Sequence, residues 1–139
     1  MGGKIWTNFG GWYHAAKFAV EGFSDCLRLE VAPFGIDVIV VEPGGIKTDW
    51  GIIAAENLKV ASAKGAYAQA ANKSADGMIR NYTGNQLSKP ELIARTICKA
   101  VTVRKPKTRY LVGFMAKPMV FLKNVFGDRA YDRIIKMFG

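Results

Sequence analysis

The sequence predicts an α/β fold with a parallel sheet, and three observations carry this prediction. Helical and strand-like segments alternate along the chain, which is typical of sheets covered by helices. The segment at 36–41 is β-branched and broken only by Asp37, as in strands buried on both faces of a parallel sheet. The length of 139 residues suits one domain, yet only about two convincing strands are found where a stable sheet usually has several. We therefore expect the C-terminal half of a larger sheet.

The first part of the chain is predicted to hold a loop, a long helix and a strand. Residues 1–12 are rich in glycine and aromatic side chains and are expected to form a loop that packs on the rest of the chain. A helix over about 13–32 follows, because apolar residues recur at helical spacing and Pro33 stops them. The strand then occupies 36–42, and the turn-forming residues from Pro43 to Gly45 end it abruptly.

The second part is predicted to be mostly helical. Residues 54–80 are alanine-rich and helical, with Gly65 and Gly77 as candidate breaks. The remaining segments are a loop over 81–89, a helix from Pro90 to about Val103, a short strand over 110–113, and one or two helices over 115–138 with a break near Gly127.

Composition excludes several classes of protein. Half of the residues are hydrophobic and 22% are charged, which argues against intrinsic disorder. The longest apolar runs are far shorter than the roughly 20 residues that span a bilayer, so no transmembrane segment is expected. The two cysteines make no disulfide scaffold and no Cys-x-x-Cys pair, and no metal site is predicted. Since no signal peptide is visible, we expect a cytoplasmic protein.

The net charge of +9 lies entirely in the C-terminal part of the chain. Residues 1–87 hold 8 basic and 8 acidic side chains, whereas residues 88–139 hold 12 basic and 3 acidic ones. The densest basic run, 104–109, can bind nucleic acid or an anionic membrane surface, or it can be a solvated turn. We favour the turn, because no zinc-finger spacing, recognition helix or RNA-binding aromatic motif accompanies it. No nucleic-acid partner is therefore expected.

The candidate chemistry begins with Tyr13 and Lys17, which lie four positions apart on the predicted helix. Helix geometry places both side chains on one face, with their Cβ atoms about 5–6 Å apart. A neighbouring ammonium favours the phenolate of a tyrosine and lowers its pKa, which is otherwise too high for efficient proton transfer at neutral pH. Such a pair can serve as a general acid/base, although the spacing alone also describes an ordinary exposed helical pair.

Two longer motifs around this pair resemble the short-chain dehydrogenase/reductase family. The segment from Tyr13 to Glu30, YHAAKFAVEGFSDCLRLE, resembles the family's catalytic helix. The strand that follows and the sequence PGGIKT at 43–48 resemble the family's next strand and its Pro-Gly-x-x-x-Thr loop. Because both motifs occur at the expected separation, the chain is identified as a member of this family, with a weaker likeness over 54–139. The fold this implies is the C-terminal half of a Rossmann-like, doubly wound parallel sheet.

The resemblance implies an NAD(P)-dependent oxidoreductase that interconverts an alcohol and a carbonyl. Tyr13 would exchange a proton with the substrate oxygen. Lys17 would lower the pKa of Tyr13 and hydrogen-bond the nicotinamide ribose, so both residues would also contact the cofactor. The cofactor would carry the hydride while the protein orients it.

The resemblance also implies that the loop 43–48 lines the nicotinamide. The backbone of Ile46 and the side chain of Thr48 would meet the carboxamide and the nearby phosphates. Glycine permits close backbone approach to a flat ring, which suits this location. The cofactor-binding residues implied in this loop are Pro43, Gly44, Gly45, Ile46 and Thr48.

Residues 51–88 correspond to the family's mobile substrate lid, and residues 89–139 complete the domain as helix, strand and helix. The lid is mostly alanine with scattered larger apolar residues, which indicates an apolar carbonyl or alcohol as substrate. Trp12 and Trp50 flank the proposed site and either line a substrate cleft or simply pack.

The chain also departs from the family pattern. The family's glycine-rich dinucleotide fingerprint is absent, since the glycine pairs near the start do not follow a strand. The family's catalytic serine precedes the tyrosine by thirteen residues, which is one position before Met1. We therefore expect a truncated chain that is inactive on its own, with Met1 an internal methionine used as a start, a gene-model error or a deliberate truncation. The region that chooses between NAD and NADP is missing too, so either cofactor is expected.

Two hypotheses of different class remain. The chain is either the proton-transfer and nicotinamide half of an enzyme, or a non-catalytic association module that folds by oligomerising. A half-domain with exposed sheet edges and apolar faces has reason to pair with itself, and family subunits pair through their long helices, so a homo-oligomer is expected. Of the remaining residues, His14 is expected on the surface or in packing, and Cys26 in the core.

Overall fold

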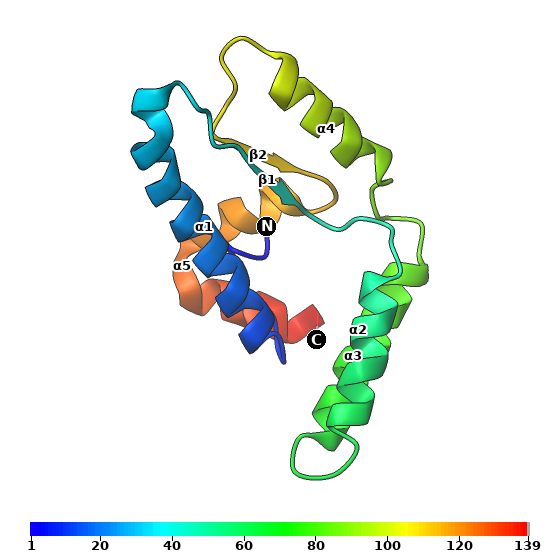
Figure 1. Cartoon of the computed structure of the whole chain (residues 1–139). Coiled ribbons are helices and arrows are strands. Elements are labelled where there is room, and N and C mark those ends of the chain that lie inside the picture. The colour runs from blue at the N-terminus through cyan, green and yellow to red at the C-terminus, as the bar shows by residue number, and fades with distance from the viewer. Residues whose placement is uncertain (139) are drawn as a thin grey trace.

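The computed structural model describes residues 1–138 and arranges helices around a two-stranded parallel sheet (Figure 1). This is the predicted α/β class, and it corresponds to part of a Rossmann-like sheet. In chain order the elements are α1 (Gly11–Val31), the 3-10 turn η1 (Ala32–Phe34), β1 (Val40–Pro43), α2 (Trp50–Ala61), α3 (Ala68–Thr83), α4 (Glu91–Thr102), β2 (Arg109–Val112) and α5 (Ala116–Phe138).

The sheet pairs β1 with β2 in parallel, and α4 and α1 lie on its opposite sides (Figure 1). The predicted strand over 36–42 begins later than expected, at Val40, which stands opposite Arg109. Residues 36–39 have no partner strand, because the ladder starts where the Val40 N–H donates to the carbonyl of Thr108 at 2.9 Å. The prediction that this strand is buried on both faces is also wrong, because Val40 and Val41 are only half-buried and Ile36 is 55% exposed.

Helices α2 and α3 form a hairpin that extends away from the sheet (Figure 1). Small side chains allow the two helices to pack closely, since Ala55 of α2 and Ala71 and Ala75 of α3 have no exposed surface. The connection contains Gly65 at φ +106°, which confirms the break predicted there. Gly77 does not break the second helix, and α3 continues to Thr83 rather than ending at residue 80.

The N-terminal segment 1–10 is held against α5. Tyr131, the one large side chain of residues 1–138 with essentially no exposed surface, donates its hydroxyl hydrogen to the carbonyl of Trp6 at 3.0 Å. The indole Nε1 of Trp6 donates to Asp132 Oδ1 at 2.9 Å. Helix α5 is interrupted at Gly127, as predicted. None of the helices in this described part of the chain is long and apolar enough to cross a membrane.

Much of α1 faces solvent. Phe23 and Leu29 are 68% and 72% exposed, and Cys26, which was expected in the core, is also exposed. Within residues 1–138 the inner side of α1 contacts the N-terminal segment and β2, and no element covers its outer side. The helix therefore presents an apolar surface of a kind that soluble monomers rarely leave open.

Candidate active site

Tyr13 and Lys17 lie one turn apart near the start of α1 and beside the carboxyl end of β1. The ammonium Nζ of Lys17 lies 5.7 Å from the centroid of the Tyr13 ring, within the range of a cation–π contact. The predicted helical spacing thus brings the two side chains together. The carboxyl end of a parallel strand is also where open α/β sheets bind their ligands.

Aromatic rings and the N-terminal segment surround Tyr13. The ring of Trp50, at the start of α2, lies 5.1 Å from that of Tyr13, and Tyr82 of α3 lies 6.2 Å from Trp50. On the other side, a Cβ atom built on Gly2 would be 3.0 Å from Cε1 of Tyr13, so this glycine lets the chain lie directly on the ring. Tyr13 keeps 39% of its surface exposed.

Burial raises the pKa of Tyr13 above its ordinary value of 10.0. This differs from the sequence-based expectation that Lys17 lowers it. The physical reason is location: the ammonium lies over the ring, while burial disfavours the charged phenolate. Tyr13 is therefore a protonated phenol at neutral pH, which suits a proton donor.

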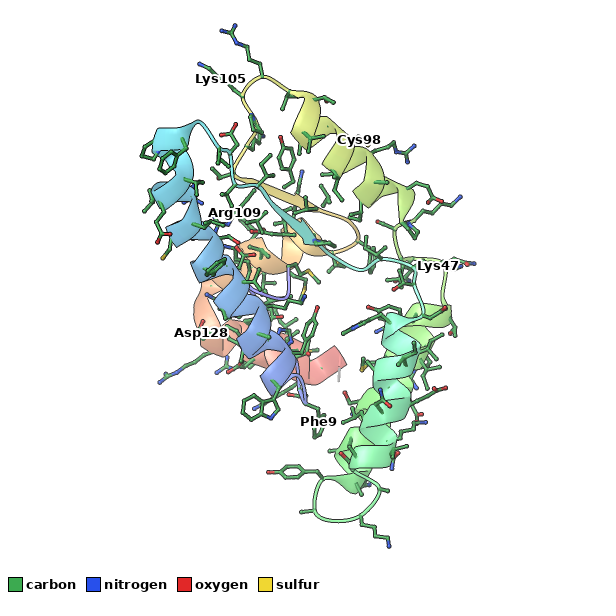
Figure 2. The ribbon with its side chains drawn as sticks, in the orientation of Figure 1. Phe9, Lys47, Cys98, Lys105, Arg109 and Asp128 are labelled. Carbon is green, nitrogen blue, oxygen red and sulfur yellow. The ribbon has the colours of Figure 1, made fainter. Side chains whose placement is uncertain are left out.

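The loop 43–48 leaves β1 and is held by backbone hydrogen bonds. The N–H of Gly44 donates to Val112 O at 2.7 Å, and the N–H of Gly45 donates to Phe114 O at 2.9 Å. Gly44 is needed by the chain's own packing, since a Cβ there would lie 2.4 Å from Phe114 O. Close approach of a flat ring is therefore not required to explain this glycine. Lys47 points outward from the loop (Figure 2).

Two cavities meet at Tyr13, which lines both together with Trp50 and Tyr82. The first, of about 620 Å³, is bordered by Lys17 and by Pro43, Gly44, Ile46 and Thr48 of the loop. The second, of about 400 Å³, lies between the N-terminal segment and the α2–α3 hairpin and is lined by Gly45. No Asp, Glu, Lys or Arg side chain lines this second cavity within the described residues. Trp12 is 94% exposed and borders neither cavity.

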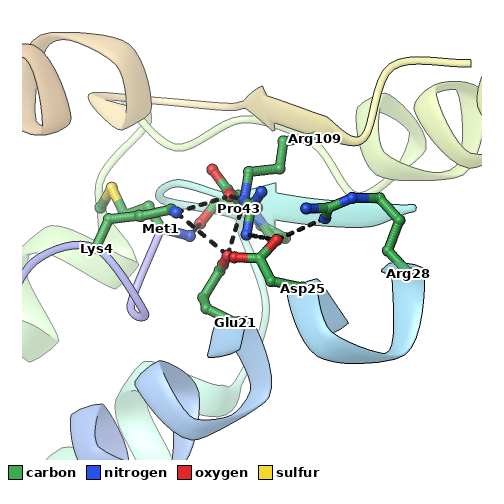
Figure 3. Close-up of polar contacts among 8 residues, drawn as sticks. Met1, Lys4, Glu21, Asp25, Arg28, Pro43 and Arg109 are labelled. Atoms are coloured by element: carbon green, nitrogen blue, oxygen red, sulfur yellow. Dashed lines mark hydrogen bonds and ion pairs between the residues drawn. The ribbon is translucent and has the colours of Figure 1, made fainter. Parts of the chain in front are cut away.

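Beside the first cavity, an ion-pair cluster joins α1 to both strands (Figure 3). Arg109 of β2 is central: its Nε lies 3.0 Å from Glu21 and 3.1 Å from Glu42, and its Nη2 donates to Asp25 at 2.7 Å. Lys4 adds pairs to Glu21 at 3.3 Å and to Glu42 at 3.8 Å. The rest of the basic run 104–109 forms an outer loop, with Lys105 near its tip (Figure 2).

The pKa values of the cluster follow from burial and partners. Hydrogen bonds from Arg28 and Arg109 lower the pKa of Asp25. Burial, and then the charge of Glu21, raise the pKa of Glu42, whose side chain is only 4% exposed. One oxygen of Glu42 has no hydrogen-bond partner within the described chain and relies on charge attraction alone.

Sequence reasoning missed two residues near the site. Glu42 was treated only as the end of a strand, although a carboxylate that directly follows a run of apolar residues in a strand is a sign of a buried ion pair. His14 was expected on the surface or in packing, and it proves to be buried at 8% exposure with both ring nitrogens hydrogen-bonded. No sequence pattern reveals those bonds, because their partners lie in an irregular loop. No group of three or more His, Cys, Asp or Glu able to hold a metal ion occurs in residues 1–138.

Comparison with known proteins identifies relatives of this architecture. A family model for short chain dehydrogenase matches residues 1–58, the part that contains Tyr13, Lys17 and the loop 43–48. The chain is 38% identical to oxidoreductase BOA17 of Botryotinia fuckeliana over 81% of its length and 40% of the relative. It is 34% identical to mouse retinol dehydrogenase 5 over 96% of its length and 44% of that protein.

A third similarity points the same way. The probable short-chain type dehydrogenase/reductase VdlC of Helicobacter pylori is 29% identical over 99% of this chain and 49% of its own length. The chain spans less than half the length of each of these relatives. These three relatives are named as an oxidoreductase, a short-chain type dehydrogenase/reductase and a retinol dehydrogenase. The chain is related to the short-chain dehydrogenase/reductase family.

Proposed function

We propose that the chain forms the proton-transfer and nicotinamide side of an NAD(P)-dependent oxidoreductase that interconverts an alcohol and a carbonyl. The observation that carries the proposal is the position of Tyr13, which borders both cavities and stands beside Lys17. The family's nicotinamide cofactor supplies or accepts a hydride when bound. NAD and NADP remain equal candidates.

The larger cavity suits the nicotinamide end of such a cofactor, because its donor set matches that group. The Lys17 ammonium can donate to ribose hydroxyls, and the Thr48 hydroxyl can donate to a carboxamide or phosphate oxygen. Pro43, Gly44 and Ile46 would provide the backbone side of the site, and Gly45 borders the smaller cavity next to them. Backbone hydrogen bonds already hold the loop 43–48 in place, so binding of the cofactor would order few further residues.

Tyr13 would act as general acid when a carbonyl is reduced. Its hydroxyl would donate a proton to the substrate oxygen, and the Lys17 ammonium, 5.7 Å from the ring centroid, would lie beside the phenolate that remains. Because burial raises the pKa of Tyr13, the protonated phenol is the form present at neutral pH. The acid form that carbonyl reduction needs is therefore present near pH 7, whereas alcohol oxidation needs the phenolate, which forms only under more alkaline conditions.

The smaller cavity would hold an uncharged, apolar substrate. Within residues 1–138 no charged side chain lines it to pair with a carboxylate or phosphate, and the N-terminal ammonium of Met1, which also borders it, already donates to Pro43 O at 2.8 Å. Burying an unpaired charge is costly. Trp50 and the α2–α3 hairpin would then act as the lid expected over 51–88. Retinol dehydrogenase 5, one of the relatives, is named for an apolar alcohol.

The test is a titration of the 139-residue chain with NADH and with NADPH, followed by tryptophan quenching. We expect weak saturable binding that Lys17→Met and Thr48→Ala both weaken, while Lys47→Met, on the outward side of the same loop, leaves it unchanged. If neither Lys17→Met nor Thr48→Ala weakens the binding, the assignment of the larger cavity to the cofactor is refuted.

Turnover is measured with the same protein and decanal as an apolar carbonyl. We expect none from the isolated chain, because the adenosine side of the family's cofactor site has no counterpart among the residues that carry the resemblance. Should NAD(P)H oxidation be detected, Tyr13→Phe must lower it by about 10²–10⁴-fold, the usual contribution of a general acid. A smaller loss of activity would show that Tyr13 is not the general acid.

The second candidate is an association module, and the exposed outer side of α1 favours it. Phe23 and Leu29 lie on this helix, and the free edge of β1 offers further unpaired backbone. A second copy of the chain would cover these surfaces. Light scattering is expected to give a mass above 15.2 kDa that Phe23→Glu reduces to that of a monomer, whereas a monomeric parent chain at all concentrations would contradict this candidate.

A further inference from the structure

The one histidine of the chain, His14, is buried directly beside the candidate acid. It is the only buried residue of α1. Its ring lies edge-to-face to that of Tyr13, with centroids 5.1 Å apart. A buried polar ring on an otherwise exposed helix requires hydrogen-bond partners, and both ring nitrogens have them.

The partners of His14 determine which nitrogen carries the proton. The backbone N–H of Thr7 points at Nε2 from 3.0 Å, and a backbone N–H can only donate, so Nε2 accepts and carries no hydrogen. The carbonyl oxygen of Gly2 lies 2.8 Å from Nδ1 and can only accept, so Nδ1 carries the hydrogen. His14 is therefore a neutral imidazole in the Nδ1–H tautomer.

These bonds hold the N-terminal segment at two points. One point is Gly2, whose α-carbon rests against the Tyr13 ring so closely that a Cβ would be 3.2 Å from the phenolic oxygen. The other is Thr7, whose Oγ1 also lies 3.0 Å from Nε2. A Cβ on Gly10 would lie 2.7 Å from Cδ2 of His14, so the loop is shaped to the imidazole. His14 thus fixes the wall beside the Tyr13 hydroxyl.

We propose that His14 is a positioning residue: its neutral Nδ1–H imidazole clamps Gly2 onto Tyr13 and so sets how the phenol presents its hydroxyl to the two cavities. The proposal rests on the proposed role of Tyr13. His14 does not itself exchange protons with substrate, because both of its nitrogens are occupied within the chain. Its effect passes through the position and solvent access of the neighbouring tyrosine.

The first test is made on the unaltered chain and needs neither cofactor nor turnover. Long-range ¹⁵N–¹H correlation spectra of the imidazole distinguish the two neutral tautomers and the cation. At neutral pH we expect the pattern of a neutral ring protonated at Nδ1. A ring protonated at Nε2, or at both nitrogens, would overturn the proposal, since neither form can accept the Thr7 N–H while donating to Gly2.

The second test separates the two bonds. In His14→Asn the side-chain amide can still donate to Gly2 O, whereas in His14→Gln the longer side chain reaches the Thr7 N–H and leaves Gly2 unheld. The readout is the pKa of Tyr13, followed by NMR of tyrosine labelled at Cζ. We expect His14→Asn to keep the raised value and His14→Gln to shift it down toward 10.0 as water gains access.

A matched control distinguishes positioning from general destabilisation. Thr96→Ala removes another buried hydrogen bond, from Thr96 Oγ1 to Leu92 O at 2.8 Å in α4, far from Tyr13 along the chain. It is expected to lower the melting temperature without moving the Tyr13 resonance. An unchanged Tyr13 pKa in folded His14→Gln would refute the proposal that His14 holds Gly2 against Tyr13. If that variant fails to fold, the tautomer of His14 in the unaltered chain still tests the proposal. Failure of cofactor binding would count against the proposed function and would leave both readouts unaffected.

Discussion

The hydroxyl of Tyr131 donates a hydrogen bond to the backbone carbonyl of Trp6 across 125 positions of sequence. The same pair is in edge-to-face contact, with ring centroids 5.2 Å apart. Helix α5 thereby holds the segment that His14 holds from the opposite side. The loop beside Tyr13 is thus anchored by α1 and by α5, although it has no regular secondary structure.

Removing the Tyr131 hydroxyl tests this anchor. Tyr131→Phe keeps the ring contact with Trp6 and leaves a carbonyl without its donor, so we expect the free energy of unfolding to fall by about 1 kcal/mol. Tyr131→Ala removes the one large, fully buried ring and is expected to cost about 3–5 kcal/mol. Urea unfolding measures both. Equal losses in the two variants would show that the ring does not contribute to the core.

Alkaline pH should weaken the same anchor. Burial raises the pKa of Tyr131 to about 12, against roughly 10 in the unfolded chain. A folded-state pKa above the unfolded one means that the stabilisation is complete below about pH 10 and is lost as the pH rises toward 12. Thermal melts between pH 9 and 12 are expected to show this decline. In Tyr131→Phe the decline must be shallower, since Tyr13 and Tyr82 are then the tyrosines with a raised pKa that still contribute to it.

Local patterns of the sequence predict the helices well. The stop at Pro33, the break at Gly65, the helix start beside Pro90 and the interruption at Gly127 each depend on one residue's backbone, and each occurs in the structure. The start of β1 was predicted wrongly, because β-branched residues from Ile36 onward describe a strand only where a partner runs beside them. Whether a segment pairs as a strand depends on the rest of the fold and not on its own sequence alone.

The candidate site, too, could be predicted from local sequence only in part. Helical spacing brings Tyr13 and Lys17 together, but it does not reveal that the ammonium lies over the ring or that burial dominates the pKa. Those features depend on Gly2 and Trp50, which pack on Tyr13 from outside the helix. The cofactor roles inferred for the loop 43–48 stay predictions.

The ion-pair cluster offers a prediction of stability. Arg109→Met leaves the buried Glu42 beside Glu21 with only Lys4 as a nearby side-chain cation, so we expect a loss of about 2–4 kcal/mol. Adding Glu42→Gln to Arg109→Met removes the carboxylate charge that has lost its Arg109 partner, and should recover part of that loss in stability. Urea unfolding of the single and double variants measures the coupling.

A control for this effect is the exposed pair between Lys59 and Asp76, whose side chains are 38% and 52% exposed. Lys59→Met removes an exposed ion pair of 2.6 Å, which is shorter than any of the Arg109 pairs, and should change the unfolding free energy by no more than about 0.5 kcal/mol. If Lys59→Met and Arg109→Met cost the same, burial would not be the source of the cluster's contribution.

Two glycines should respond in opposite directions to the same substitution. Gly51 is buried at the start of α2, and a Cβ there would lie 2.3 Å from the ring of Tyr82, so Gly51→Ala must push α2 away from α3. We expect a loss of about 1–3 kcal/mol and a weaker contact between Trp50 and Tyr13, visible as a shift in tryptophan emission. Gly22 lies in the middle of α1 with nothing within 4 Å, so Gly22→Ala should stabilise the chain by about 0.5–1 kcal/mol through helix propensity alone. If Gly51→Ala were also stabilising, α2 would not pack against Tyr82 of α3 at Gly51, and the wall that these helices give to the smaller cavity would not be as described.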